Sequence, residues 1–224
     1  MAITFKESTK LGTVGSGSYV FRHYGNAGAI NYYVLEYLYS SGNAYIDTGV
    51  TGGTYAGYDL GIKIETVSKA WARYMGGGDL PDYPVPVSNQ GSTGSRPITI
   101  GSYYSGSLHN YVTFYPDTVW RTINVDGGNV SLDGTLQTTT ASNSGWSSTS
   151  CYLFSTHGWT GGAGACYISY CKMYIDGVLV RDFVPVRRDY DNVLGMFDKV
   201  NNKFYQSNGG TFTGGNETGE IITV

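Results

Sequence analysis

The chain has 224 residues, of which 33 are glycine and 21 are tyrosine, with 41% hydrophobic and only 14% charged residues. This length suits one β-sandwich-sized domain, and the hydrophobic fraction excludes disordered and collagen-like chains. There are 14 Lys and Arg against 17 Asp and Glu, and no basic run is longer than Arg187-Arg188, which excludes nucleic acid as a partner. No apolar stretch approaches the roughly 20 residues of a membrane-spanning helix, so a soluble protein without membrane insertion is predicted.

Residues 1 to 32 differ in composition from the rest of the chain. Leu11–Ser18 and Gly25–Ala29 resemble linkers, because their glycine and serine content lowers the capacity to bury apolar surface. We therefore expect an N-terminal arm or tether, with an ordinary packed first strand as the alternative. No apolar segment follows the first positive charges, so no secretory signal is expected if Met1 is the natural start.

From Tyr33 onward the pattern predicts strands and tight turns. Leu60, Ile62 and Ile64 alternate with polar residues and glycine, which is typical of a strand with one buried face. The same period of two recurs in a list of shorter segments: Ile98–Ile100, Val119–Val125 and Cys171–Ile175. The dipeptides Asp126-Gly127, Asp133-Gly134 and Asp176-Gly177 mark tight turns, because Asp-Gly readily adopts the positive φ angles that such turns need.

No window of a dozen residues has the apolar spacing of an amphipathic helix, so helices are expected to be short or absent. The predicted fold is therefore all-β, a two-sheet antiparallel β-sandwich over residues 33–215, followed by a tail at residues 216–224. Three segments poor in strand signal are expected to be loops that carry function: Gly76–Pro97, Thr138–Ser150 and Ser155–Ala165.

Five blocks of the sequence resemble a known family: Leu35–Leu38, Ser41–Gly49, Lys172–Arg187, Gly195–Tyr205 and Asn208–Phe212. The first two resemble the opening strand pair of a concanavalin A-like, laminin G-like jelly-roll domain, the third its penultimate hairpin and the last two its closing segment. Domains of this variety occur in bacteriophage virion proteins and in gut-bacterial surface proteins. The blocks bracket residues 33 to 213, and the resemblance concerns the fold more than any activity.

Some glucanases of this fold carry a Glu-x-Asp-x-x-Glu strand, so a carboxylate pair is the first chemistry to test. None of the five glutamates begins that pattern, which argues against a hydrolase.

Cys151 and His157 would form a thiolate–imidazole pair only if the chain folded back. The odd number of cysteines, Cys151, Cys166 and Cys171, favours reduced and buried thiols over disulfides, and their spacing does not favour zinc. The chain is therefore expected not to be an enzyme.

Calcium is the one cofactor left in consideration. Asp79 and Asp82 lie among turn-forming glycines and prolines and offer two hard oxygen ligands. The alternative is a solvated turn without a metal ion, and otherwise no cofactor is expected.

Aromatic residues in the expected loops are the candidate binding surface. Tyrosine and tryptophan suit sugar faces and wet interfaces, because an apolar ring is joined to a polar group. The candidates are Tyr83, Tyr103, Tyr104, Trp146, His157 and Trp159. Three roles stay open for them: glycan contact, a protein interface, or plain packing.

Together, the resemblance implies a non-catalytic phage virion structural protein, such as a capsid decoration protein, head fibre or tail component, made in the host cytoplasm. The arm would attach it to other virion proteins, and the loops would contact a host-surface glycan or a neighbouring subunit. A homo-oligomer is expected, since symmetric self-association is the general rule. The alternatives are a carbohydrate-binding or adhesin module at the bacterial cell surface and, less favoured, a glycoside hydrolase.

Overall fold

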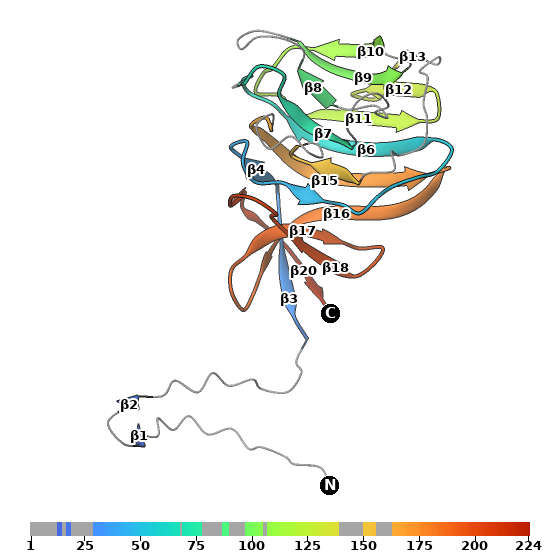
Figure 1. Ribbon diagram of the computed structural model, residues 1–224. Coiled ribbons are helices and arrows are strands. Elements are labelled where there is room, and N and C mark those ends of the chain that lie inside the picture. The colour runs from blue at the N-terminus through green and yellow to red at the C-terminus, as the bar shows by residue number, and fades with distance from the viewer. Residues whose placement is uncertain are drawn as a thin grey trace.

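The computed structural model describes residues 29–67, 69–77, 87–89, 97–104, 107–138, 150–155 and 163–224, together with two short paired strands near the N-terminus. For residues 102–104 and 107–111 only the backbone is described. Within these ranges there is no helix, and all named strand pairs are antiparallel (Figure 1). The predicted two-sheet antiparallel β-sandwich is confirmed.

The larger sheet has twelve strands and the smaller one six. The larger sheet contains β3 (Asn31–Leu35), β4 (Leu38–Ser40), β6 (Ala56–Lys63), β11 (Arg121–Asp126), β12 (Asn129–Leu132), β13 (Thr135–Thr138), β15 (Cys166–Ile175), β16 (Val178–Arg188), β17 (Leu194–Asp198), β18 (Lys203–Gln206), β19 (Thr213–Gly214) and β20 (Glu217–Thr223). The smaller sheet contains β5 (Ile46–Asp47), β7 (Arg73–Gly77), β8 (Val87–Asn89), β9 (Ile98–Tyr104), β10 (Ser107–Phe114) and β14 (Cys151–Leu153). Strands β1 (Thr13–Val14) and β2 (Gly17–Ser18) pair with each other.

The main core lies between the two sheets and is made by the alternation expected from the sequence. Leu60, Ile62 and Ile64 are at most 2% exposed, and Ile98 and Ile100 from the smaller sheet are fully buried. Large aliphatic side chains on facing strands remove apolar surface from water, at about 25 cal/mol for each Å². This burial holds the two sheets together.

The predicted turns fall where expected. At Asp133-Gly134 and Asp176-Gly177 both residues have positive φ, which is the backbone of a two-residue hairpin turn. The Asp126-Gly127 signal lies at the β11–β12 hairpin, whose two turn residues begin at Gly127.

One expected loop contains a strand. Residues 87–89 lie inside Gly76–Pro97, yet they form β8, which pairs with β7 and β9. The prediction failed because two of its three residues are polar. Ser88 and Asn89 are buried and hydrogen-bonded: the Thr99 hydroxyl donates to the Ser88 carbonyl (3.1 Å), and the Ala72 N–H donates to Asn89 Oδ1 (3.1 Å).

A second, smaller core lies in the part of the larger sheet that contains β3. Tyr32, Val34, Val186 and Phe197 are buried there, and Phe204 packs against them with its ring centroid 5.4 Å from that of Tyr32. This core ties β3 to β16, β17 and β18. Strand β20, in the segment expected as a tail, pairs with β3, while the division of the chain into arm, sandwich and tail stays a prediction.

Candidate functional site

The eight residues selected from the sequence are not placed by the structure. Tyr83, Trp146, His157, Trp159, Asp79 and Asp82 lie outside the described residues, and Tyr103 and Tyr104 belong to β9, where only the backbone is described. The glycan and calcium hypotheses for these positions stay predictions. In the part of the chain that is described, no three His, Cys, Asp or Glu side chains gather as a metal site.

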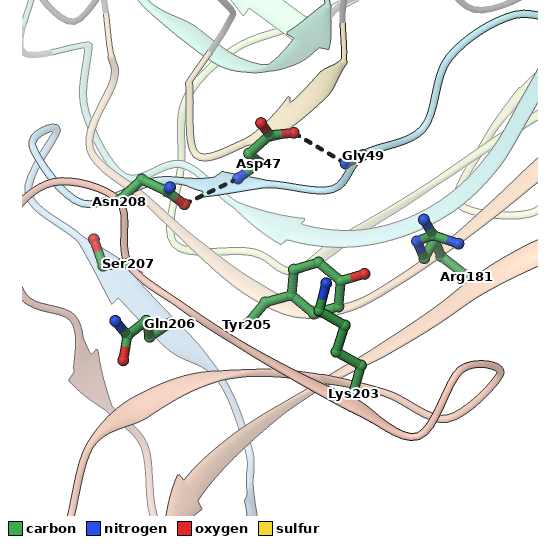
Figure 2. Close-up of a pocket in the computed structure, with 8 residues that line it drawn as sticks. All are labelled: Asp47, Gly49, Arg181, Lys203, Tyr205, Gln206, Ser207 and Asn208. Carbon is green, nitrogen blue, oxygen red and sulfur yellow. Dashed lines mark hydrogen bonds between the residues drawn. The ribbon is translucent and has the colours of Figure 1, made fainter.

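A polar pocket of about 430 Å³ lies between β5 of the smaller sheet and β16 and β18 of the larger sheet (Figure 2). One wall is β5, the last strand of the six-stranded sheet, and the other is formed by β16, β18 and the segment after β18. Its lining is Asp47, Gly49, Arg181, Lys203, Tyr205, Gln206, Ser207 and Asn208. Seven of these eight residues present polar or charged side chains, so the pocket is built for hydrogen bonding.

Arg181 is held in place by contacts with residues that do not line the pocket. Its Nε donates to the Thr48 carbonyl (3.0 Å) and its Nη1 to its neighbour's carbonyl at Val180 (2.8 Å). Its Nε also lies 3.6 Å from Oδ2 of Asp198, a fully buried carboxylate on β17. Among the described residues Nη2 has no hydrogen-bond partner, so one edge of the guanidinium is available to a ligand.

Asp198 explains why that guanidinium is needed. Its Oδ1 accepts the N–H groups of Asp182 and Val200 (both 3.0 Å), and its Oδ2 accepts from the Asn201 amide (2.6 Å). A buried carboxylate is tolerated only when it is hydrogen-bonded and its charge is balanced. Arg181 therefore pairs with Asp198 across the β16–β17 ladder, and not with its sequence neighbour Asp182.

The opposite wall is fixed by backbone hydrogen bonds. Asn208 donates its N–H to the Tyr45 carbonyl (2.9 Å), while its Oδ1 accepts from the Asp47 N–H (3.4 Å). The Asp47 carboxylate accepts the Gly49 N–H (2.9 Å) and lies beside the Tyr152 phenol, whose pKa is raised by burial and by this carboxylate. The Asp47 carboxylate is thus hydrogen-bonded within the protein, and its negative charge remains at the wall of the pocket.

Lys203 and Tyr205 form the side of the pocket on β18. The Lys203 Nζ lies 4.7 Å from the Tyr205 ring centroid, a cation–π distance, and the Tyr205 ring stands edge-on to buried Phe183 (5.2 Å). Within the described ranges no carboxylate lies within ion-pair distance of Lys203. The pocket therefore offers an incoming anion the unpaired Lys203 ammonium and the Nη2 edge of Arg181, whose charge is shared with Asp198.

A second hollow adjoins this pocket and shares Gln206 and Ser207 with it. Its volume is also about 430 Å³, and Val193, Leu194 and Phe212 make its lining more apolar.

Some of the aromatic residues that the structure places gather on the outer face of the larger sheet. Tyr39, Tyr167 and Lys63 are cross-strand neighbours on β4, β15 and β6. The Tyr167 ring lies 4.6 Å from Tyr39 and 6.4 Å from Trp120, centroid to centroid, and Lys63 Nζ lies 4.0 Å from the Tyr167 centroid. We call Tyr37, Tyr39, Lys63, Trp120 and Tyr167 the outer aromatic cluster.

The cysteines have no role in the pocket. Cys151, Cys166 and Cys171 are free and fully buried, as predicted. Burial raises the pKa of all three thiols well above the usual range, which disfavours the nucleophilic thiolate at neutral pH.

Comparison with known proteins identifies no relative: no family model matches the chain, and no curated protein matches it. Among the described residues there is no helix with the length and apolar character that crossing a membrane requires.

The pocket residues were missed by sequence reasoning, although six of the eight lie in blocks already singled out. Asp47 comes from Ser41–Gly49, Arg181 from Lys172–Arg187 and Lys203 from Gly195–Tyr205. These blocks were read as structural, a role that Asp198 does fill. The signal that would have revealed the site is their convergence in space, which requires the strand pairing to be known.

Proposed function

We propose that this chain is a non-catalytic structural protein of a bacteriophage virion that displays a pocket for an acidic saccharide. The two-sheet sandwich is compatible with the jelly roll that the sequence resembles, and only that resemblance supports the concanavalin A-like and phage context. The saccharide proposal rests on one observation: Arg181 Nη2 and Lys203 Nζ line a polar pocket in which Lys203 has no carboxylate partner among the described residues.

The chemistry of the lining favours a saccharide over a compact apolar ligand. The amides of Gln206 and Asn208 and the hydroxyl of Ser207 offer both donors and acceptors to sugar hydroxyls. The Tyr205 ring supplies one apolar surface, and the two cations favour a sugar that carries a carboxylate. No side chain of the pocket forms a nucleophile–base pair, so the proposed role is binding.

Isothermal titration and a glycan array with acidic and neutral sugars test this proposal. Lys203→Ala and Asn208→Ala should each weaken binding of an acidic sugar at least tenfold without changing the far-ultraviolet spectrum. Lys172→Ala is the matched control, because Lys172 lies on β15 away from the pocket and should leave affinity unchanged. Wild-type protein that retains no acidic glycan, or that retains it equally well without Lys203, would refute the saccharide pocket.

The virion part of the proposal has its own test. Deleting residues 1–28 leaves Ile30 and β3 intact, whose pairing with β16 and β20 belongs to the fold. If the arm attaches the protein to a particle, the shortened chain should fold and bind as before but fail to enter virions. Normal incorporation of the shortened chain contradicts attachment through the arm.

A further inference from the structure

Strand β20 presents an open edge that no described strand covers. It pairs only with β3, and the register places Ile221, Ile222 and Thr223 opposite Tyr33, Tyr32 and Asn31. The N–H and C=O groups on the far side of such a strand are free to pair with another strand.

The hydrogen-bond pattern tells which groups point to the open side. Val224 exchanges both backbone hydrogen bonds with Ile30 (2.7 and 3.1 Å). In an antiparallel ladder such pairs alternate along the strand, so Ile222 also bonds inward to β3. The backbone groups of Ile221 and Thr223 therefore point away from β3, toward the open edge.

This edge lacks the features that usually protect one. Strand β20 contains neither lysine nor proline, and its two glutamates are neutralised within the chain, Glu217 by Arg187 and Glu220 by Lys199. A bulge between Glu217 and Ile221 restricts the straight edge to residues 221–224. The side chains beside it are apolar and exposed: Ile221 by 53%, Val224 by 46% and Ile30 by 37%.

We propose that this edge pairs with the same edge of a second copy of the chain. An antiparallel strand is complementary to itself about a two-fold axis, and with both glutamates neutralised no uncompensated like charges meet. With the axis at Ile222, the N–H and C=O of Ile221 face those of Thr223 in the partner copy. Four hydrogen bonds then join the two larger sheets into one, and the exposed isoleucines and valines of both copies are covered. The inference does not depend on the saccharide pocket.

Sedimentation equilibrium of the full chain between about 1 and 100 µM tests this pairing. We expect a reversible monomer–dimer equilibrium that Thr223→Pro weakens at least tenfold, because proline removes an outward N–H. The backbone bonds to β3 stay in place, and the only bond to β3 that is lost is the one from the Thr223 hydroxyl to Asn31 Oδ1. Ile221→Lys should weaken the dimer as well, and it keeps the test valid if the proline variant fails to fold. Val200→Lys is the control, since Val200 is similarly exposed (42%) in the β17–β18 turn.

Cysteine crosslinking tests the register. Residues 222 of the two copies would form a non-hydrogen-bonded pair, whose Cα separation suits a disulfide. Ile222→Cys should therefore crosslink on oxidation, whereas Ile221→Cys should not, and the three buried native thiols should not interfere. A chain that stays monomeric at 100 µM, a dimer insensitive to both edge variants, or crosslinking at 221 and not at 222 would overturn the proposal.

Discussion

The two faces of the larger sheet are built from different residues and held by different interactions. On the inner face, Leu60, Met173 and Phe183 are fully buried against the smaller sheet, and stability there comes from apolar surface removed from water. On the outer face β6 and β15 carry tyrosines, lysines and glycines, with no second layer of strands among the described residues. Although the smaller sheet covers only its inner face, the larger sheet has packed side chains on both faces.

Glycine makes the packing of the outer face possible. A Cβ at Gly61 would lie 2.6 Å from the Tyr170 ring, so this ring lies on the bare backbone of β6. The Tyr37 ring of the outer aromatic cluster covers Gly215 in the same way, with 2.8 Å to a Cβ there. Aromatic rings placed over strand glycines shield backbone that would otherwise be open to water. The high glycine content and the high tyrosine content are thus related, because some of the glycines provide the bare backbone on which tyrosine rings pack.

The inner face should be the more sensitive to truncation. Leu60→Ala removes buried methyl groups between Ile123 and Cys171, its neighbours on β11 and β15, and leaves a cavity. We expect the free energy of unfolding in urea to fall by about 2–5 kcal/mol. Leu60→Met keeps most of the volume and should cost less than about 1.5 kcal/mol. Equal losses for the two variants would mean that the inner face is not closely packed.

On the outer face, adding a methyl group should destabilise the protein, as removing methyl groups does on the inner face. Gly61→Ala forces the Tyr170 ring and the Ser169 hydroxyl away from β6, and we expect a loss of about 1–3 kcal/mol. Tyr170→Ala in the same chain should recover part of this loss, which a double-mutant cycle measures as a coupling energy. Strictly additive losses would show that the ring does not lie on Gly61.

Local signals were sufficient to predict some of the strands and hairpins. Leu60, Ile62 and Ile64 indicated the buried face of β6 because their period of two reports directly which side chains are covered. Asp176-Gly177 indicated its turn because positive φ is a local property of these residues. Strand β8 was missed because Ser88 and Asn89 are buried through hydrogen bonds made by distant residues, which no local pattern reports.

Pro185 shows how the effect of a proline depends on tertiary pairing. Proline in a sheet usually ends the pairing or lies on an edge, whereas Pro185 lies in the middle of β16, paired on one side with Met196. On the other side of β16, pairing with β15 ends at Phe183 and pairing with β3 begins at Val186. Proline is accommodated in that gap because no N–H is required there.

The pocket was out of reach of sequence reasoning for the same reason. Asp47 and Arg181 are more than 130 positions apart, and neither forms a motif with its own neighbours. They meet because β5 is the edge of one sheet and β16 lies within the other. The pattern of each segment predicts its strand, whereas the relative placement of the strands depends on all of them together.

The outer aromatic cluster should contribute less than either site above. Tyr167→Ala removes ring contacts with Tyr37, Tyr39 and Trp120 and the Lys63 cation–π contact. Because these rings are only partly buried, we expect a loss of about 1 kcal/mol in thermal or urea unfolding. Tyr115→Ala, at a ring that is 64% exposed, should change stability by less than about 0.5 kcal/mol. If Tyr167→Ala lowers the free energy of unfolding as much as Leu60→Ala does, the outer face contributes as much to stability as the inner face.

The smallest effect should appear in alkaline solution. Burial, followed by the hydrogen bond that its hydroxyl donates to Asp59 (2.9 Å), raises the pKa of Tyr170 from 10.0 to about 12. The neutral phenol is thus favoured in the folded chain, and its stabilisation is complete below pH 10 and is lost as the pH rises from about 10 to about 12. Tyr170→Phe should flatten this part of the stability profile, by less than about 1 kcal/mol because the phenol is partly solvated. Tyr190, which is 64% exposed, is the control, and Tyr190→Phe should leave the profile unchanged. If the stability of Tyr170→Phe falls between pH 10 and pH 12 as steeply as that of the wild type, the Tyr170 phenol is not buried against the outer face.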